Sequence, residues 1–243
     1  MNKIFIGIIF ITHLFGQYPD AKEILQKIDQ NMSSDNQVVV STMVIHGRRS
    51  SRSITSKSWV QGSEKSFTEY LAPAREKGTK MLKIDDQLWM YSPQSDRTIR
   101  ISGHMLRQSL MGSDLSYEDM MEDRRLVDLY SAEITGEEQM NNRDCWIMEL
   151  TAKEDDISYH IQKFWVDKEY MLPLKEQLYA KSGKLLKIIE LSDLFQVDGR
   201  WYPKRMLFQD ALLKGKGTEF IIKSIDFDQD IPEYIFSKAS LRK

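Results

Sequence analysis

Short segments that alternate between apolar and polar residues dominate the chain, and they restrict it to a fold built from antiparallel strands. An alternation with a period of two indicates a strand, and these segments are rich in β-branched and aromatic residues. Typical turn formers separate them, such as Gly62-Ser63, Asn141-Asn142 and Asp198-Gly199. The segments predicted to be strands are residues 37–45, 53–61, 65–71, 79–84, 87–92, 97–102, 130–137, 145–152, 159–166, 174–179, 184–191, 201–210 and 218–227.

The spacing of these segments predicts a single domain with an antiparallel barrel or sandwich. Successive segments begin roughly 8–15 residues apart, which is too close for strand–helix–strand units. One helix is expected at residues 21–32, where Ile24, Leu25 and Ile28 form an apolar stripe behind the capping residue Asp20. The 243 residues contain no internal repeat or long linker, so they suit one large domain.

Several predicted strands carry large apolar residues on both faces. The stretches 146–150, 163–167 and 184–191 hold more of these residues than a sheet with one solvated face requires. A curved sheet with helices packed into its concavity would explain this excess. An apolar cavity for a ligand would explain it equally well, and the residues leave both explanations open.

Residues 1–16 are predicted to be a signal peptide rather than part of the fold. Lys3 precedes an apolar run over residues 4–16, which is shorter than the roughly 20 residues that span a membrane. Residues 14–17 resemble a bacterial lipobox, but Gln17 occupies the position of the acylated cysteine. We therefore expect a domain of residues 17–243 that is exported to the periplasm and is not lipidated.

Composition narrows the classes of function. The net charge is −2, and 34 basic and 36 acidic residues are interspersed, so no basic field is available for binding nucleic acid. A hydrophobic content of 41% supports a sizeable core. Cys145 is the only cysteine, so no intrachain disulfide can form, and we expect its side chain to be a small buried hydrophobe.

The strand pattern is interrupted by a segment rich in methionine and leucine at residues 104–123. The near-helical spacing of its apolar residues predicts two short helices, separated at Gly112-Ser113, with the second beginning at Ser116. In one interpretation these flexible side chains cap the core of the sheet. In the other, the segment is a movable lid over an acyl-chain cavity, hinged at Gly112-Ser113. The residues assigned to the lid are Met105, Leu106, Leu110, Met111 and Gly112.

Three acidic residues of the same segment, Asp114, Glu118 and Asp119, are the first candidates for a catalytic or metal site. Mg²⁺ and Ca²⁺ need more ligands or a recognisable loop, and the histidines after residue 16 stand apart without HExxH spacing. No GxSxG elbow, P-loop or GxGxxG motif occurs. We therefore expect a non-enzymatic protein with no catalytic residue, metal or cofactor.

Three motifs, in order, resemble those of the bacterial outer-membrane lipoprotein-sorting proteins, which are relatives of the lipoprotein carrier LolA. They are YLAPAREKGTKML at Tyr70–Leu82, LWMYSPQSDRTIRI at Leu88–Ile101 and LMGSDLSYEDM at Leu110–Met120. The resemblance extends to the C-terminal Pro232–Phe236. The family's GSD-SYED motif, which the resemblance assigns to structural capping, comprises Gly112, Ser113, Asp114, Ser116, Tyr117, Glu118 and Asp119.

The resemblance implies a mainly β fold with some helix: a single-domain, strongly curved, incomplete antiparallel β-barrel whose helices close a hydrophobic cavity. It also implies a non-catalytic carrier that binds acyl chains of lipoproteins or lipids and ferries them between the inner and outer membranes. The residues predicted to line the cavity are Trp59, Phe67, Met81, Trp89, Trp146, Met148, Phe164, Leu186 and Ile188.

The partners implied by the resemblance are an acylated lipoprotein or lipid cargo, an inner-membrane transporter of the ABC or resistance-nodulation-division type, and an outer-membrane acceptor. Nucleic acid is not among them. An alternative with the same fold is a periplasmic interaction or sensor module that binds an envelope protein and fills its cavity with its own side chains.

Overall fold

The computed structural model describes residues 18–122 and 124–242, so the predicted signal peptide of residues 1–16 lies outside the described residues. Within them, 13 strands form one antiparallel sheet, and each overlaps a segment predicted from the sequence. The strands are β1 (Asn36–His46), β2 (Ser51–Gln61), β3 (Lys65–Ala72), β4 (Lys80–Ile84), β5 (Gln87–Ser92), β6 (Arg97–Ile101), β7 (Tyr130–Met140), β8 (Arg143–Ala152), β9 (Ile161–Asp167), β10 (Pro173–Tyr179), β11 (Leu185–Val197), β12 (Arg200–Asp210) and β13 (Thr218–Phe227).

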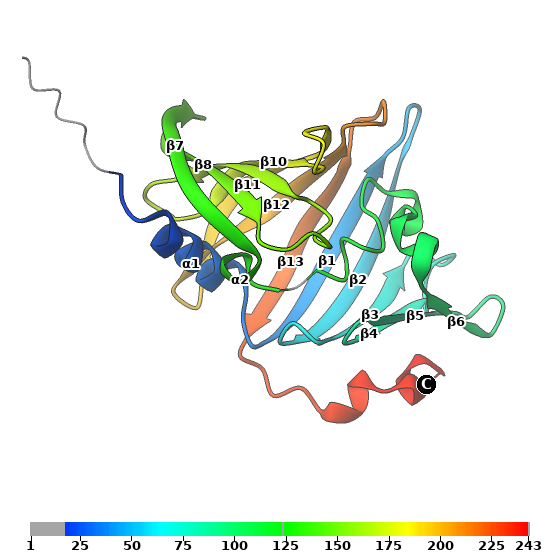
Figure 1. Cartoon of the computed structure of the whole chain (residues 1–243). Coiled ribbons are helices and arrows are strands. Elements are labelled where there is room, and N and C mark those ends of the chain that lie inside the picture. The colour runs from blue at the N-terminus through cyan, green and yellow to red at the C-terminus, as the bar shows by residue number, and fades with distance from the viewer. Residues whose placement is uncertain (1–17, 123, 243) are drawn as a thin grey trace, which may run out of the picture.

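The strand order joins the two halves of the chain at the middle of the sheet. It runs β6-β5-β4-β3-β2-β1-β13-β12-β11-β10-β9-β8-β7, so only the β1–β13 pair among the described strands joins elements distant in sequence. The edge strands β6 and β7 do not pair with each other in this order. Figure 1 shows the strong curvature of the sheet, which makes it an incomplete barrel. The predicted fold class is confirmed.

Helix α1 (Ala21–Met32) covers one half of the concave face, as its apolar stripe predicts (Figure 1). Asp20 caps the helix, because its carboxylate accepts the N–H of Lys22 at 2.8 Å. The buried Ile24, Leu25 and Ile28 pack against β7–β10 in a cluster that includes Met148 and Phe164. This packing identifies the concave face of these strands.

The short helix α2 (Leu126–Leu129) was not predicted, and its position depends on a contact from α1. The carboxylate of Asp29 accepts the N–H groups of Leu126 at 2.9 Å and Val127 at 3.0 Å. These bonds satisfy two of the donors that a helix N-terminus leaves without a partner inside the helix. A helix of four residues is too short to produce a periodic pattern in the sequence.

The convex face of β3–β5 is covered by the C-terminal residues, which form the 3₁₀ helices η3 (Glu233–Phe236) and η4 (Lys238–Arg242). Phe236 and Leu241 pack on this face, and the ammonium of Lys238 lies 4.2 Å from the ring centroid of Trp89. Apolar residues on the convex side of these strands are therefore buried by the chain itself.

Cys145 is buried on the convex face, in a cluster with Trp165 and Leu174. Burial raises the pKa of its thiol to about 11. The side chain is therefore a protonated thiol at neutral pH, and its environment matches the expected role as a small hydrophobe.

The prediction of two helices after residue 103 was wrong in its second half. The first part contains the 3₁₀ helices η1 (Gly103–Arg107) and η2 (Leu110–Gly112), but residues 117–121 form only turns. Ser116 and Asp119 do exchange the hydrogen bonds of a helix start. The structure then makes a single turn, because the carbonyl of Met121 accepts the ammonium of Lys83 at 2.8 Å instead of continuing a helix.

Candidate functional site

The candidate site is the concave face of the sheet together with the connection between β6 and β7, residues 103–122, which we call the cross-face segment. Figure 1 shows this connection folded back over the strands β1–β5. Leu110, Leu115 and Tyr117 are buried there against Met81 and Ile54 of the sheet. The four methionines of the segment pack on the same cluster: Met105, Met111, Met120 and Met121. The methionines thus cap one half of the concave face.

Asp114 fastens the middle of the cross-face segment to the sheet. Its carboxylate accepts the hydroxyl of Thr218 at 2.6 Å and the backbone N–H of Asp210 at 3.2 Å. The hydroxyl oxygen of Thr218 in turn accepts the N–H of Asp114 at 3.0 Å. Thr218 begins β13 and Asp210 ends β12, so one carboxylate binds both strands at the base of their hairpin.

Asp119 fastens the end of the segment, through an ion pair with Lys187 of β11. The ammonium and the carboxylate are both largely buried, with side-chain exposures of 6% and 12%. The same carboxylate accepts the hydroxyl of Tyr159 at 2.5 Å and the N–H of Ser116 at 2.6 Å. The carboxylate therefore joins the segment to β11 and to the loop before β9.

The electrostatics of this cluster keep Asp119 ionised. Burial alone would raise the pKa of Asp119, but the charge of Lys187 and the hydrogen bonds from Lys187, Tyr159 and Ser116 outweigh burial and lower it. Burial and the neighbouring Asp119 carboxylate together raise the pKa of Tyr159, which stays a hydrogen-bond donor. A carboxylate and a phenol fixed in this way hold the segment in place and are not available for proton transfer near neutral pH.

The remaining residues of the motif shape the turn or fill the core. Gly112 has φ of +70°, and a Cβ at this position would lie 3.0 Å from the guanidinium of Arg52. That guanidinium donates a hydrogen bond to the carbonyl of Met111. Ser113 is buried and accepts the N–H of Leu115 at 3.2 Å. A residue with a Cβ would therefore be strained at Gly112, the position predicted to be a hinge.

Two motif side chains have different surroundings. The hydroxyl of Tyr117 donates to the sulfur of Met90 at 3.7 Å, so this ring belongs to the apolar cluster. Glu118 contributes its backbone N–H to the carbonyl of Leu106 at 2.8 Å. Among the described residues, its carboxylate has no hydrogen bond or ion pair.

The nine residues predicted to line a cavity are divided between the two faces of the sheet. Cross-strand partners share a face and successive residues alternate, so the registers assign each side chain to one side. On the concave face lie Met81, Trp146, Met148 and Phe164. On the convex face lie Trp59, Phe67, Trp89, Leu186 and Ile188. The first three of the convex set are packed near the C-terminal residues and do not face the concavity.

The residues that organise the site were not singled out from the sequence. They are Lys187, Thr218 and Tyr159, each contributed by a segment far from the motif. Only Lys187 could have been recognised from the sequence, because it stands between Leu186 and Ile188 within an otherwise apolar stretch. A lone charge flanked in this way on a two-sided apolar strand indicates a buried partner.

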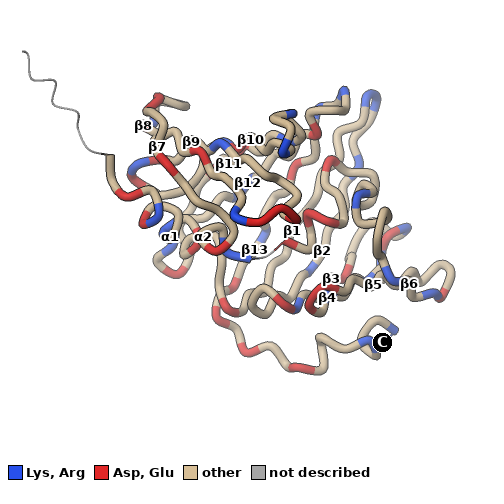
Figure 2. Tube along the Cα trace, viewed as in Figure 1, with Lys and Arg blue, Asp and Glu red and all other residues tan. Residues whose placement is uncertain are grey.

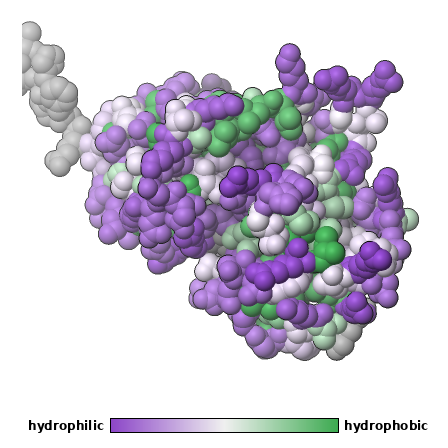
Figure 3. Space-filling view, turned by 45° about the vertical axis from the view of Figure 1, so that its right-hand side comes forward, coloured by the Kyte–Doolittle hydropathy of each residue, from purple (hydrophilic) through white to green (hydrophobic). Residues whose placement is uncertain are grey.

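Apolar side chains remain partly exposed on the central strands of the concave face. Figure 3 shows a hollow between the part of the molecule around α1 and the part that carries the cross-face segment, with apolar surface along it. Phe208 and Phe220, whose ring centroids are 5.6 Å apart, border the cluster of the cross-face segment. Ile189 borders the cluster of α1, and Met206 is the cross-strand partner of Phe220. The unfilled apolar surface of the concave face thus lies over β11–β13.

Glu176 places a single carboxyl group in this apolar region. Its cross-strand partners are Phe164 and Ile189, both on the concave face. Among the described residues, its carboxylate makes no hydrogen bond or ion pair, and burial raises its pKa to about 7. The folded protein therefore binds this proton more tightly than the unfolded chain does.

We expect Glu176→Gln to stabilise the protein at pH 8 and to leave its stability unchanged at pH 4. Since the pKa of Glu176 rises from 4.5 to about 7 on folding, the free energy of unfolding of the wild type falls as pH rises through this window. The variant should gain about 1–3 kcal/mol at pH 8 in urea unfolding. Glu190→Gln, an exposed change on the convex side of β11, is the matched control. A gain in stability that is equal at both pH values would contradict a raised pKa for Glu176.

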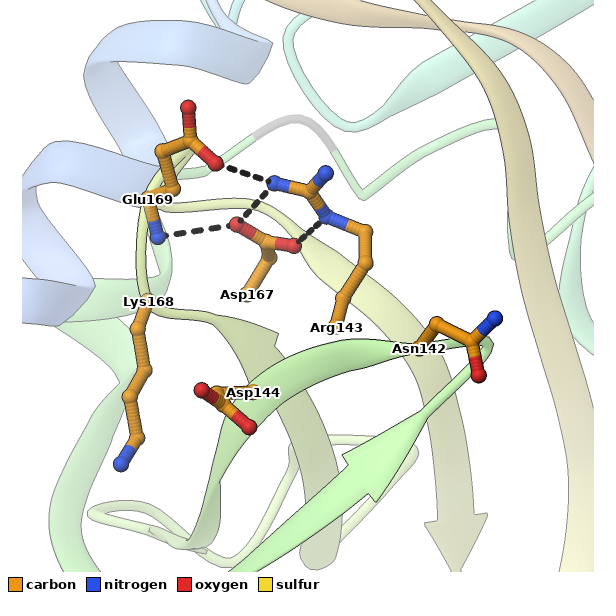
Figure 4. A pocket seen from close by; sticks show the side chains of 6 residues that line it. All are labelled: Asn142, Arg143, Asp144, Asp167, Lys168 and Glu169. Carbon is orange, nitrogen blue, oxygen red and sulfur yellow. Dashed lines mark hydrogen bonds and ion pairs between the residues drawn. The ribbon is translucent and has the colours of Figure 1, made fainter.

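Away from the concave face, a polar pocket of about 250 Å³ lies at the β7–β8 turn (Figure 4). Its centre is the buried carboxylate of Asp167, which pairs with Arg143 and accepts the N–H groups of Glu169 at 2.9 Å and Tyr170 at 2.8 Å. Burial alone would raise the pKa of Asp167, but these partners outweigh it and lower the pKa. Because the charges already satisfy one another, we assign this pocket a structural role.

Two further observations concern the described residues as a whole. In residues 18–122 and 124–242, no three His, Cys, Asp or Glu side chains are grouped in a way that would hold a metal ion. Over the same residues, none of the helices has the length and apolar character needed to cross a bilayer.

The strongly curved, incomplete barrel is a LolA-like fold, and solved structures share this fold. An outer membrane lipoprotein-sorting protein domain from Vibrio parahaemolyticus has a TM-score of 0.79 and 24% identity, over 92% of this chain and 98% of that one. A DUF1329 family protein from Desulfovibrio piger has a TM-score of 0.80 and 27% identity, over 90% and 97%. A LolA superfamily protein from Nitrosomonas europaea has a TM-score of 0.75 and 24% identity, over 92% and 100%.

The fold expected from the resemblance to lipoprotein-sorting proteins is confirmed by these structures. The chain belongs to a family described as "-like: Uncharacterized protein", whose model matches residues 62–243. No curated protein matches the chain.

Proposed function

We propose that the protein is a non-catalytic periplasmic carrier that binds acyl chains of lipoproteins or lipids and moves them between the inner and outer membranes. The observation that carries this proposal is the concave face, where the partly exposed Phe208 and Phe220 adjoin a cross-face segment rich in methionine and Ile189 adjoins the cluster of α1. Side-chain contacts to Asp114 and Asp119 hold this segment on the sheet, and contacts of this kind can open without unfolding the sheet.

The free energies involved explain why such cargo needs a protein. Each methylene transferred out of water contributes about 0.8 kcal/mol, so a chain of about 16 carbons contributes roughly 12 kcal/mol. An apolar concave face offers the chain an environment comparable to the membrane interior. Met105 and Met111 are adaptable in shape, which suits acyl chains of different lengths.

The direction of transfer has to come from the partners. The sequence contains no P-loop, so the proposed energy source is an inner-membrane transporter of the ABC or resistance-nodulation-division type. An outer-membrane acceptor with a higher affinity for the cargo would complete the transfer. The name of the Vibrio parahaemolyticus relative, a lipoprotein-sorting protein, favours acylated cargo.

The proposal is tested by identifying what the protein carries. The full chain is expressed, recovered from the envelope fraction without detergent and analysed by native mass spectrometry and lipid extraction. We expect a bound lipid or acylated peptide, and saturable uptake of a fluorescent fatty acid by the emptied protein. Protein that is always empty and takes up no fatty acid would refute the carrier function.

One observation favours a second function, that of an interaction or sensor module. The side chains Leu110, Leu115 and Tyr117 already fill half of the concave face, as expected of a protein that fills its cavity from within. This function predicts a specific envelope protein in pull-downs and no bound lipid. The mass spectrometry above distinguishes the two.

A further inference from the structure

Three turns lie side by side at one end of the sheet, and we call them the basic rim: residues 47–50, 180–184 and 211–217. They join β1 to β2, β10 to β11 and β12 to β13. Because β1 pairs with β13 and β11 pairs with β12, the turn 211–217 lies between the other two. Figure 1 shows the three turns projecting together at the top of the molecule.

Two large apolar side chains are exposed at the centre of the basic rim. Leu212 and Leu213 are 54% and 60% exposed, although they are neighbours on a single turn. Two hydrogen bonds to Asp210 fix this turn. The N–H of Leu212 donates to the Asp210 carboxylate at 2.8 Å, and the N–H of Leu213 donates to the Asp210 backbone carbonyl at 3.1 Å. The leucines are therefore held outward by a defined backbone conformation. Paired exposed leucines of this kind indicate a binding surface.

Positive charge surrounds these leucines. The exposed cations of the rim are Arg48, Arg49, Lys184, Lys214 and Lys216. None of the five forms an ion pair within the described part of the chain, whereas Lys181 of the same rim pairs with Asp155 at 2.7 Å. Figure 2 shows basic residues at the tips of the three turns. The whole chain has a net charge of −2, so this concentration is local.

We propose that the basic rim docks the protein on a bilayer with anionic headgroups. Its five cations are complementary to the negative charge of such a surface. Leu212 and Leu213 are suited to insertion at the boundary between the headgroups and the acyl chains. Cations next to an anionic bilayer and a small inserted apolar group together produce reversible attachment. This inference does not depend on the proposed function, because the rim lies at the strand ends and the concave face lies along the strands.

The rim is tested by co-sedimentation with vesicles of phosphatidylcholine containing phosphatidylglycerol, and with vesicles of phosphatidylcholine alone. We expect binding to the anionic vesicles that weakens with salt. Since each cation near such a surface contributes about fivefold in affinity, Lys214→Glu with Lys216→Glu should weaken binding by about 25-fold or more. Leu212→Ser with Leu213→Ser should weaken it about tenfold, with the salt dependence retained.

The matched control is Lys22→Glu with Lys27→Glu, which makes the same charge change on the exposed side of α1. It should bind anionic vesicles nearly as well as the wild type. Equal losses in the control and rim variants would overturn the proposal, because attraction would then follow total charge. So would the absence of vesicle binding by the wild type, or pull-down of an envelope protein through the leucines without any vesicle binding.

Discussion

Lys187→Met is expected to lower the free energy of unfolding by about 3–5 kcal/mol, the range found when one partner of a buried ion pair is removed. The variant leaves the Asp119 carboxylate buried at 12% side-chain exposure without its cation. Methionine has nearly the volume of the lysine side chain, so the loss reports charge and not a cavity. Urea unfolding at pH 7 measures it.

Two variants separate the charge from other effects. Adding Asp119→Asn to Lys187→Met should recover part of the stability, because the neutral amide removes the unpaired charge. Lys181→Met breaks the exposed pair with Asp155, whose side chains are 64% and 83% exposed, and should have no measurable effect. An equal loss of stability in Lys181→Met and Lys187→Met would contradict the conclusion that the buried Lys187–Asp119 pair holds the segment on the sheet.

The deficit of Lys187→Met should also depend on pH. In the wild type the pKa of Asp119 is lowered below 3.8, so its stabilising effect is present above that value and is lost as pH falls through the lowered pKa. Without Lys187, burial dominates and Asp119 becomes protonated at a higher pH. The difference between variant and wild type should therefore shrink as pH falls from the raised pKa of Asp119 in the variant, above 3.8, toward the lowered pKa of Asp119 in the wild type.

Asp114→Cys combined with Thr218→Cys is expected to slow the exchange of bound fatty acid at least about tenfold when the disulfide forms, if the cross-face segment opens as a lid. The native carboxylate and hydroxyl oxygens meet at 2.6 Å, so the two side chains point toward each other. Cys145 is buried on the convex face and stays outside the reaction. Stopped-flow transfer of a fluorescent fatty acid to vesicles, with and without reductant, measures the rate.

A cross-link that does not involve the segment is the control. Thr42→Cys with Thr55→Cys joins β1 to β2, where the two hydroxyl oxygens lie 3.2 Å apart, and it should leave the exchange rate unchanged. Equal rates for the oxidised and reduced forms of the first variant would show that the segment is a fixed cap. That result would leave open carrier function through the hollow beside it.

The strands and the helix α1 were predictable because their signals are local. Alternation and turn formers mark each strand, and the cap at Asp20 marks the start of α1. The cross-face segment was predicted less well because distant residues determine its conformation. Asp114 is held by Thr218 and Asp119 by Lys187, and no local pattern shows these pairs.

The candidate cavity residues show a second limit. Trp59, Phe67 and Trp89 were selected because they are large and apolar, but size does not show which face a residue occupies. Here both faces of the sheet are covered, since Phe236 and Leu241 of the C-terminal residues pack on the convex side. The predicted cavity function of the concave members Met81, Trp146, Met148 and Phe164 stays a prediction.

The pairing of β1 with β13 sets the order in which this protein can assemble. Gln37 pairs with Phe227, so the middle of the sheet closes only after nearly the whole chain is available. The hairpins on either side connect neighbouring strands and form earlier, while closure of so long a loop is slow. We therefore expect folding on the order of milliseconds to seconds. Until that last step, the inner edges of β1 and β13 stay unpaired and offer backbone N–H and C=O groups to other chains, as edge strands do.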